Sequence, residues 1–523
     1  MKDTLKERVR DASLHKLFAT PDKAIELFEQ AGAGQRVLDL GWSGFTPVGY
    51  PKVVPIALAD HVEKNGLQGK WKFNLFIGAS VGAETEDRWA ALDMIDRRWP
   101  YQTGKNIAKG INSGKIRMGD THLSVFPMDL RYGFYTKDRG GKLDFGLIEA
   151  SAITADGNIV LTGAIGAAPE IIDIADKIIV EINTALPSLE GMHDIVMTDV
   201  PPFRKLLPLT DIKQRIGTPW VPTDKHKIVA IIESNRPDTG RALRGTDEQS
   251  QAIADHIVDF LLHEVKAGRM PKNLLPLQSG VGSIANAVVG GLTKSPFNNL
   301  YVFTEVLQDT FLPFLDSGKC KYISCTSLSL SPEGFKTWWE NFDTYKELVV
   351  MRPQQISNNP GIIRRLGVIA MNTPVEIDIF AHANSTCVGG TRMINGIGGS
   401  GDFERNSYIS IVHCPSVRPS KTDPLGISGV VPKVPHVDHT EHDIDILVTE
   451  QGLADVRGMA PKDRAREIIK KCAHPAYRDY LMDYLERAEK KTGYAHEPHL
   501  LNECYKMHLS YEETGTMRFW EKK

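Results

Sequence analysis

The chain has 523 residues and a net charge of -3 at pH 7, with 24% charged and 41% hydrophobic residues. At roughly 100–200 residues per domain, this length predicts about two to four domains. The small net charge excludes a global attraction to nucleic acid or to acidic membranes. The sequence holds no apolar run of about 18 residues, so no transmembrane helix is predicted. We therefore expect neither nucleic acid nor a membrane as a partner.

Cysteine usage and the first residues bear on the compartment. No spacing among the six cysteines resembles a zinc site or a disulfide framework, which favours a reducing compartment. The segment Met1–Arg10 is charged and amphipathic and lacks a secretory core, and its Asp3 and Glu7 argue against a transit peptide. We expect a cytoplasmic protein, with the mitochondrial matrix as the alternative.

Hydrophobic periodicity predicts alternating helices and strands in the first half of the chain. Residues 23–31 have an amphipathic helical pattern, and residues 37–40, 73–78 and 177–182 are short apolar runs typical of strands. This alternation predicts stacked α/β layers. The predicted fold class is therefore α/β with open sheets.

A proline-rich stretch at residues 200–225 predicts a linker between two domains. Beyond it, residues 227–233 have the pattern of a strand, and residues 274–289 that of a strand, a glycine turn and a helix. We therefore predict an N-terminal α/β domain at 1–225 and a C-terminal α/β domain at 226–523.

Glu305 is the strongest candidate for a catalytic group. It follows Leu300–Phe303, a hydrophobic and β-prone run that predicts a buried strand. A carboxylate at the end of a buried strand costs desolvation energy unless something uses it, and such a group can act as a covalent nucleophile. Because Glu305 falls within the predicted domain at 226–523, we expect the C-terminal domain to carry the nucleophile. The alternative is an ordinary acid that is solvated or paired with Lys or Arg.

Two glycine-rich segments lie on either side of Glu305 in the sequence. In Gln278–Asn286 a strand turns into a helix, where backbone N–H groups favour a phosphate, a carboxylate or a developing oxyanion. Ala285 excludes a G-x-G-x-x-G pattern, and no Gly-Lys-Ser/Thr follows as in a Walker A loop. The glycines of Asn395–Phe403 permit close approach of a ligand to the backbone. The alternatives are a tight turn for the first segment and a flexible surface turn for the second.

Three further candidates have weaker patterns. The run His436–His442 is dense in His and acidic residues, which suits a divalent metal, although closely spaced His residues also serve in hydrogen-bond networks. Glu450 follows the predicted strand 444–448 and is a candidate for positioning a substrate, with a solvated or Arg-paired acid as the alternative. Cys325 has no evident His partner, so a small buried hydrophobe is favoured over a thiolate nucleophile.

In combination, these segments resemble the acetyl-CoA hydrolase/transferase family, whose members include succinyl-CoA:acetate CoA-transferases. The match runs almost end to end, and it is specific because its motifs occur together. The motifs are LGWSGF at 40–45, GAS at 78–80, QSGVG at 278–282, TEVLQD at 304–309, ISNNP at 356–360, RRLGVIAMNTPVE at 364–376, NGIGGS at 395–400, HVDHTEH at 436–442 and TEQGLAD at 449–455.

The resemblance implies two CoA-transferase-type domains with the active site between them, and a homodimer. It implies that Glu305 forms a glutamyl-CoA thioester and that Asn358 positions this nucleophile. Contacts to CoA are implied for Gln278, Ser279, Gly280, Val281, Gly282, Asn395, Gly399 and Lys421. A small-carboxylate pocket is implied for Ser80, Thr103, Arg236 and Glu450.

The mechanism that these roles require is a transfer in two half-reactions. Glu305 attacks an acyl-CoA thioester, the CoA thiolate returns to the glutamyl carbonyl, and a second carboxylate runs the sequence backward. Backbone N–H groups near Val281 and Gly399 are the expected oxyanion donors, each contributing about 3 kcal/mol. No metal or redox cofactor is needed, and CoA itself is a substrate.

Three functions compete on this sequence. The first is reversible CoA transfer between acetyl-CoA and succinate, which a carboxylate-binding Arg236 favours because hydrolysis needs no acceptor pocket. The second is acetyl-CoA hydrolysis on the same scaffold, with water in place of the acceptor acid. The third is a non-catalytic nucleotide- or CoA-binding module, in which Glu305 is replaceable by Gln or Asp. We expect transfer, with hydrolysis as the alternative.

Overall fold

The computed structural model describes residues 3–240 and 245–521, which form two compact units. The first unit combines residues 3–240, 302–312 and 321–362, and the second combines residues 245–301, 313–320 and 363–521. This division differs from the predicted limits at residues 225 and 226 in two respects. The strand after residue 227 stays with the first unit because it pairs with that unit's sheet, and the segment that carries Glu305 also returns to the first unit.

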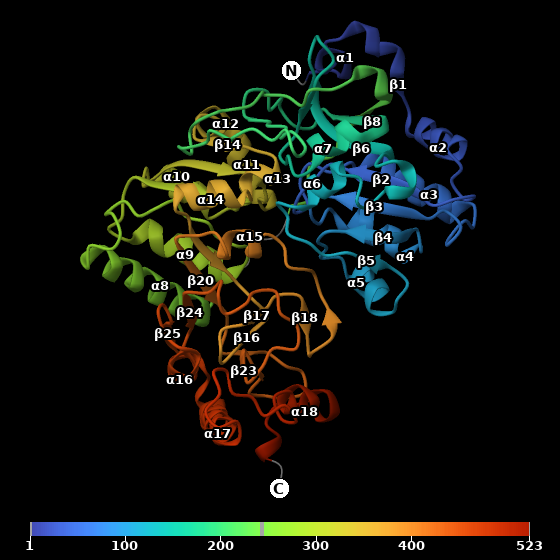
Figure 1. Ribbon diagram of the computed structural model, residues 1–523. Helices are drawn as coiled ribbons and strands as arrows, with labels where there is room; N and C mark the ends of the chain where they lie inside the picture. Colours follow the sequence, from blue (N-terminus) through green and yellow to red (C-terminus); the bar gives the residue numbers. More distant parts are fainter. Residues whose placement is uncertain (1–2, 241–244, 522–523) are drawn as a thin grey trace. The chain divides into compact units, whose positions relative to one another are not determined.

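A nine-stranded sheet organises the first unit, in the order β1-β9-β8-β6-β2-β3-β4-β5, with β7 paired to β6 (Figure 1). Neighbouring strands are parallel, except that β7 runs antiparallel to β6. The central strand β6 (Leu143–Ile153) is buried along its whole length, as in parallel sheets that are covered on both faces. The other strands are β1 (Phe18–Ala19), β2 (Leu38–Trp42), β3 (Phe73–Ile77), β4 (Ile95–Trp99), β5 (Arg117–Met118), β7 (Ile159–Leu161), β8 (Ala175–Asn183) and β9 (Ile228–Ser234).

Amphipathic helices cover this sheet. Helix α2 (Pro21–Gln30) begins with a proline and buries Ala24, Leu27 and Phe28, which share one face because they are three and four residues apart. It packs against β9 and α3, and α7 packs against β2, β6 and β8. The remaining helices of this part are α1 (Leu5–Arg8), α3 (Val53–Lys64), α4 (Arg88–Ala91), α5 (Lys105–Asn112), α6 (Phe126–Arg131) and α7 (Ala168–Ile174).

The later segments of the first unit form short strands and helices. A bond from Asp194 N–H to the Met351 carbonyl (2.9 Å) and a fully buried Arg352–Asp194 ion pair (3.0 Å) tie them to the earlier residues. The strands are β11 (Val306–Leu307) paired in parallel with β13 (Ser327–Leu328), and β10 (Leu300–Phe303), β12 (Cys320–Cys325) and β14 (Val349–Met351) in a three-stranded sheet. The helices are α11 (Pro332–Glu340), α12 (Phe342–Tyr345) and α13 (Gln354–Ser357). Strands β10 and β12 and helices α10 (Phe311–Asp316) and α14 (Pro360–Leu366) contain residues of both units.

The proline-rich stretch at 200–225 belongs to the first unit and is not a free linker. Thr218 exchanges backbone hydrogen bonds with Ile195, and Val221 does so with Ile159. Arg352 also donates to the Gln214 carbonyl at 2.6 Å. Because proline lacks an N–H group, the stretch makes isolated bridges instead of a continuous ladder.

The second unit is built around a four-stranded sheet in the order β15-β20-β24-β25. Helices α8 (Glu248–Lys266) and α9 (Ser283–Lys294) lie side by side, and α8 contacts β24 and β25 (Figure 1). The strands are β15 (Ile369–Asn372), β16 (Glu376–Asp378), β17 (Ala383–Asn384), β18 (Cys387–Val388), β19 (Arg392–Met393), β20 (Ile409–His413), β21 (Val417–Arg418), β22 (Ile427–Ser428), β23 (Val430–Val431), β24 (Ile446–Thr449) and β25 (Gly452–Asp455). The remaining helices are α15 (Ser400–Glu404), α16 (Pro461–Cys472), α17 (Pro475–Lys491) and α18 (Lys506–Thr514).

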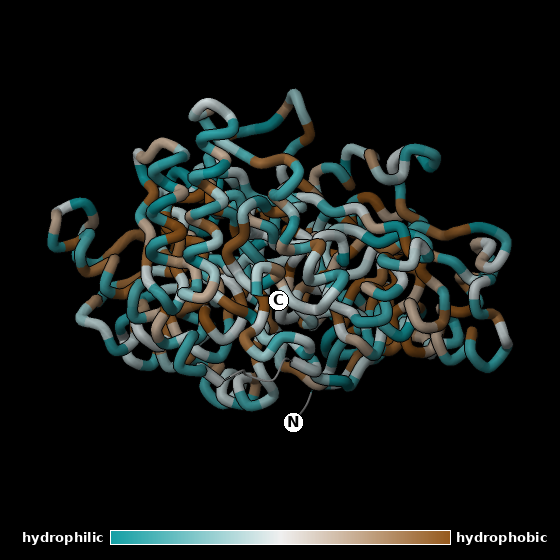
Figure 2. The backbone as a smooth tube through the Cα atoms, turned by 90° about the horizontal axis from the view of Figure 1, so that it is seen from below, coloured by the Kyte–Doolittle hydropathy of each residue, from teal (hydrophilic) through white to brown (hydrophobic). Residues whose placement is uncertain are grey.

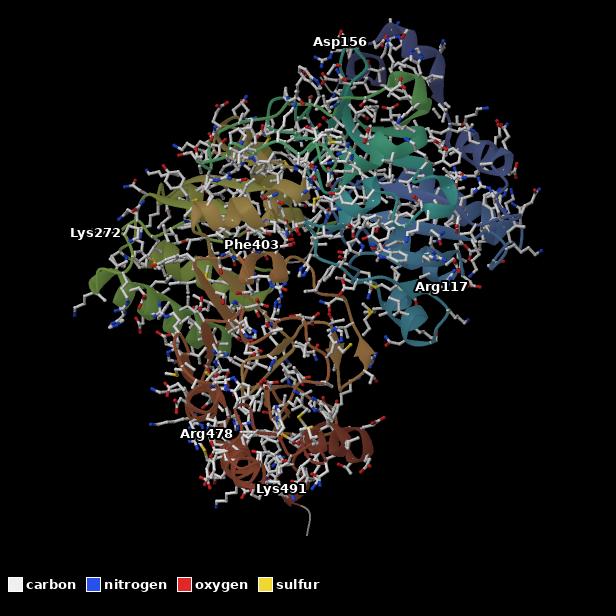
Figure 3. The ribbon with its side chains drawn as sticks, in the orientation of Figure 1. Arg117, Asp156, Lys272, Phe403, Arg478 and Lys491 are labelled. Carbon is white, nitrogen blue, oxygen red and sulfur yellow. The ribbon has the colours of Figure 1, made fainter. Side chains whose placement is uncertain are left out.

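Polarity follows the pattern expected from the sequence. Short hydrophobic segments alternate with hydrophilic ones along the backbone (Figure 2), and charged side chains such as Arg117 and Lys491 are exposed (Figure 3). In the part of the chain that the structure describes, every helix is too short or too polar to cross a bilayer. The predicted α/β class is confirmed.

Candidate active site

Glu305 lies in the bend between β10 and β11, within the first unit. Its backbone carbonyl accepts hydrogen bonds from the N–H groups of Thr326 (2.8 Å) and Ser327 (3.1 Å). Its sequence neighbours Thr304 and Val306 are buried, whereas Glu305 itself is half-buried. The structure therefore places a carboxylate at the end of a buried strand, as the sequence predicts.

Asn358 contacts Glu305 directly. Its Nδ2 donates to Oε1 of Glu305 at 2.6 Å, although the two residues are 53 positions apart. Asn358 follows α13 and is fully buried, and its Oδ1 accepts from Ser357 Oγ at 2.8 Å. With the oxygen occupied in this way, the amide nitrogen faces the carboxylate. A hydrogen bond to a carboxylate oxygen favours the ionised form, which is the nucleophilic one.

Helix α13, which carries Asn358 at its end, is held by two buried glutamines. Gln354 Nε2 donates to the Leu123 carbonyl at 2.8 Å. Gln355 Nε2 donates to Glu170, and its Oε1 accepts from Thr198 Oγ1 at 2.9 Å. Glu170 is fully buried on α7, and this burial raises its pKa to about 8. An un-ionised Glu170 therefore supports the helix that presents Asn358 to Glu305.

Three of the predicted carboxylate-binding residues follow parallel strands of the nine-stranded sheet. Buried Ser80 comes after β3, exposed Thr103 after β4, and exposed Arg236 after β9. The carboxyl ends of parallel strands meet at one edge of a sheet, where ligands of open α/β sheets bind. Ser80 and Thr103 thus follow adjacent strands, whereas β9 lies four strands from β3, about 19 Å at 4.8 Å per strand.

The loop that carries Arg236 is anchored by buried groups. Asn183 Nδ2 donates to the Arg236 carbonyl at 2.8 Å, and two residues later Asp238 pairs with Lys52 Nζ at 2.8 Å. The same Lys52 Nζ lies 2.5 Å from Glu149 Oε2. Sequence patterns did not single out Lys52 or Asp238, since an isolated charged residue beside apolar neighbours carries no distinctive signal.

The glycine loop at 278–282 lies in the second unit, directly before α9, and its first residues bond to β15. Gln278 N–H donates to the Ile369 carbonyl and Gly280 N–H to the Met371 carbonyl, each at 2.9 Å. Gly282 precedes α9 with a φ of 117°, a region that favours glycine. Val281 is 43% exposed. The predicted glycine turn and the helix after it are present, whereas the predicted strand before them is only an isolated bridge between Leu277 and Ile369. The Gln278 side chain is buried and bonded to Asn372.

The second glycine segment leads into α15. Gly399 precedes the helix, and its carbonyl accepts from the N–H of Asp402 at 3.1 Å. Ser400 Oγ lies 3.0 Å from Nε2 of the buried His439. Phe403, also buried, packs the short helix into the unit (Figure 3). Asn395, at the start of the segment, is half-buried.

The two other candidates of the second unit differ in their surroundings. Lys421 is exposed on the segment between β21 and β22. Glu450, half-buried after β24, accepts from Ser416 N–H at 2.9 Å, from Ser416 Oγ, and from Gln451 Nε2 at 3.2 Å. Burial raises the pKa of Glu450, but the bonds from Ser416 outweigh it and hold the pKa below its usual value. Glu450 is therefore an ionised acid held by hydroxyl and amide donors, not an Arg-paired one.

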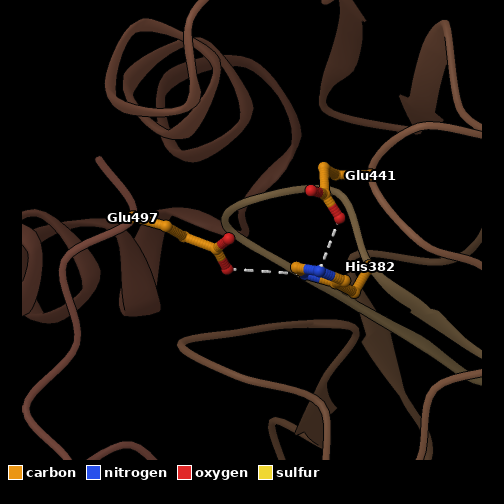
Figure 4. Close-up of side chains that lie close together, drawn as sticks. All are labelled: His382, Glu441 and Glu497. Carbon is orange, nitrogen blue, oxygen red and sulfur yellow. Dashed lines mark ion pairs between the residues drawn. The ribbon is translucent and has the colours of Figure 1, made fainter.

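Among the described residues, one group of three possible metal ligands comes together: His382, Glu441 and Glu497 (Figure 4). His382 Nε2 lies 2.8 Å from Glu441, and Nδ1 lies 3.1 Å from buried Asp378 and 3.8 Å from Glu497. Burial lowers the pKa of His382, but these carboxylates outweigh it and raise the pKa. The predicted run at 436–442 contributes only Glu441 to this group, whose contacts are those of a charged hydrogen-bond network.

Cys325 is a buried hydrophobe, not a thiolate. It lies at the end of β12 and is fully buried. Burial raises the pKa of its thiol to about 12, and the charge of Arg352 lowers it only in part. A thiol with such a pKa is not a nucleophile near neutral pH.

Two parts of this chain match one known protein family. Residues 1–233 match the acetyl-CoA hydrolase/transferase N-terminal domain, and residues 334–485 match the C-terminal domain of the same description. The chain is 56% identical over 517 residues to a Neurospora crassa protein named acetyl-CoA hydrolase, covering 98% of this chain and 97% of that one. The chain belongs to the acetyl-CoA hydrolase/transferase family.

Other members and solved structures agree with this assignment. Proteins named acetyl-CoA hydrolase from Schizosaccharomyces pombe and Saccharomyces cerevisiae are each 55% identical, covering 99% of this chain and 99% and 98% of theirs. RipA from Yersinia pestis matches with a TM-score of 0.68 at 21% identity, covering 92% of this chain and 98% of that chain. A 4-hydroxybutyrate CoA-transferase from Porphyromonas gingivalis matches with a TM-score of 0.60 at 17% identity, covering 91% and 98%. These structures show a CoA-transferase-like α/β fold, as the resemblance predicts.

Proposed function

We propose that this chain cleaves the thioester of acetyl-CoA through covalent attack by Glu305, with water as the final acceptor. The observation that carries the proposal is the 2.6 Å bond from Asn358 Nδ2 to Glu305 Oε1 at the end of a buried strand. Full-length relatives named acetyl-CoA hydrolase support water as the acceptor. This reverses the preference for CoA transfer that the sequence gives alone.

The reaction begins with the Glu305 carboxylate. One oxygen attacks the acetyl carbonyl, the carbon–sulfur bond breaks, and an acetyl-glutamyl anhydride forms as the CoA thiolate leaves. The thiolate attacks the glutamyl carbonyl and expels acetate, which gives a glutamyl-CoA thioester. Water then attacks this thioester: Glu305 returns as a carboxylate, one proton passes to the CoA thiolate, and one is released to solvent.

Each tetrahedral intermediate needs donors for its oxyanion, and we assign these to backbone N–H groups near Val281 and Gly399. CoA contacts are assigned to the loop at 278–282, to Asn395 and to Lys421. The exposed Lys421 ammonium suits a phosphate of CoA. Asn358 holds the nucleophile, so that less freedom of rotation is lost on reaching the transition state.

The second candidate is CoA transfer to a small carboxylate such as succinate. The anchored Arg236 loop favours it, because a fixed guanidinium suits an acceptor carboxylate, and hydrolysis does not need one. For CoA transfer, we assign binding of the acceptor carboxylate to Ser80, Thr103, Arg236 and Glu450. A homodimer is proposed for either activity.

Mass spectrometry after mixing the enzyme with acetyl-CoA tests the proposal. We expect a CoA adduct on the peptide that carries Glu305, decaying in water to free CoA, and no adduct in Glu305→Gln, with turnover reduced by about 10⁴-fold or more. Glu233→Gln, an exposed acid on β9, is the matched control and should react normally. Decay that requires succinate and yields succinyl-CoA would establish transfer. Absence of adduct and turnover would overturn the covalent proposal.

A further inference from the structure

Three buried side chains connect the two glycine segments of the second unit. Gln278 Nε2 donates to Asn372 Oδ1 at 2.9 Å, and Asn372 Nδ2 lies 3.1 Å from Gln278 Oε1. Asn372 Nδ2 also donates to Glu404 Oε1 at 2.7 Å. The residues are 1%, 8% and 3% exposed, so this chain of bonds, which we call the amide bridge, is shielded from water.

The amide bridge begins and ends next to the segments assigned to CoA. Gln278 is the first residue of the 278–282 loop, and Gln278 Oε1 also accepts from Met371 N–H at 2.9 Å. Glu404 is the last residue of α15, whose first turn follows Gly399. Asn372, at the end of β15, lies between them. The bridge thus joins two segments that lie far apart in sequence, and β15 is its fixed support.

Glu404 enters this bridge as an un-ionised acid. Burial is the main cause that raises its pKa well above the usual value, and the charges of Asp445 and Asp443 add to it. Hydrogen bonds from Asn372 and Ser410 act in the opposite direction but do not outweigh burial. An uncharged carboxyl accepts the Asn372 amide without the cost of burying an unpaired charge. Ionisation would add a third negative charge close to the two aspartates.

We propose that Asn372 and Glu404 are positioning residues that set the distance between the two oxyanion donors near Val281 and Gly399. The inference rests on the proposed function, which assigns these donors to the thioester end of acetyl-CoA. A donor contributes fully only when it lies within hydrogen-bond reach of the oxyanion. Loosening the amide bridge shifts one donor relative to the other, which affects the chemical step more than CoA binding.

Three variants test this role through the rate of adduct formation on Glu305 in a single turnover with acetyl-CoA. Glu404→Leu removes the acceptor for Asn372, and we expect the rate to fall about 10-fold to 100-fold, with CoA affinity changed less than about threefold. Glu404→Gln keeps an uncharged oxygen at Oε1, so its rate should return to within about threefold of the unmodified enzyme. Asn372→Leu should match Glu404→Leu.

The pH profile and a control separate positioning from general destabilisation. The unmodified enzyme should lose rate as pH rises and Glu404 ionises, and Glu404→Gln should lack this loss. Glu489→Leu removes another buried glutamate of the second unit, on α17, and should leave the rate unchanged if folding is intact by circular dichroism.

The outcomes distinguish this inference from the proposed function. If the unmodified enzyme forms no adduct, the covalent function itself fails. If it does and Glu404→Leu reacts at an unchanged rate, the positioning role is overturned. A Glu404→Gln variant as slow as Glu404→Leu would overturn it equally, because the amide keeps the acceptor oxygen.

Discussion

The two units hold their candidate substrate loops by opposite electrostatic means. In the first, the loop of Arg236 is held by Lys52, whose ammonium is shared between Glu149 and Asp238 with both partners essentially buried. Burial lowers the pKa of Lys52, but the two carboxylates outweigh it and raise the pKa, so the ammonium stays charged. In the second, the amide bridge uses uncharged groups throughout.

The difference has consequences for stability. Removing one partner of a buried ion pair leaves the other charge uncompensated, and this costs more than losing a neutral hydrogen bond. The buried ion pairs of Lys52 hold the Arg236 loop in one position, because separating Lys52 from Glu149 or Asp238 would leave a buried charge unpaired. The uncharged arrangement tolerates isosteric replacement, because no group in it depends on an opposite charge.

Lys52→Met should lower the free energy of unfolding by about 3–5 kcal/mol, because Asp238 is left buried without its cation and Glu149, whose pKa is raised to about 8 mainly by burial, loses its ion-pair partner. Urea unfolding at pH 7 measures the change. Since this variant can fail to fold, Lys52→Met combined with Asp238→Asn provides a second measurement, and it should recover part of the loss by removing one uncompensated charge. A loss below about 1 kcal/mol in Lys52→Met would contradict the charged arrangement.

Glu170→Gln should remove a pH dependence from stability. Between the usual glutamate value of 4.5 and about 8, folded Glu170 keeps a proton that the unfolded chain releases. Its contribution to stability is therefore fully present below pH 4.5 and is lost as pH rises to about 8. Across this window the free energy of unfolding of the variant should rise relative to that of the unmodified protein by on the order of 4 kcal/mol. Urea unfolding from pH 5 to pH 9 measures it, and a constant difference would contradict the prediction.

Lys225→Met should have the smallest effect, at most about 1 kcal/mol, because the Lys225 side chain is 37% exposed. Its hydrogen bond to Asp11, aided by Ser13, lowers the pKa of Asp11 to about 2. The stability that this pair contributes is present above the usual aspartate pKa of 3.8 and is lost as pH falls towards 2. Urea unfolding at pH 7 measures the size of the change, and urea unfolding at pH 3 measures its loss on acidification. A change in the free energy of unfolding as large as that of Lys52→Met would contradict the expectation that exposed ion pairs contribute less than buried ones.

Much of the local structure could be predicted from the sequence. The helix predicted at 23–31 corresponds to α2, and the strand predicted at 177–182 lies within β8. The strand before Glu305 and the turn at Gly282 follow from residue preferences within a few positions. The domain limits did not follow, because the composition of residues 200–225 carries no record of the partners, such as Ile195 and Arg352, that hold them in the first unit.

By itself, the sequence determined the α/β class, the strand-end position of Glu305 and the glycine loops, since each depends on neighbours along the chain. The tertiary structure decided which distant side chains meet. The bond between Glu305 and Asn358 spans 53 residues, and the one between Gln278 and Asn372 spans 94. Such meetings depend on strand order, register and packing, which local hydrophobic patterns do not encode. For the same reason, the charge state of Glu404 is a property of its burial in the fold and not of its sequence neighbours.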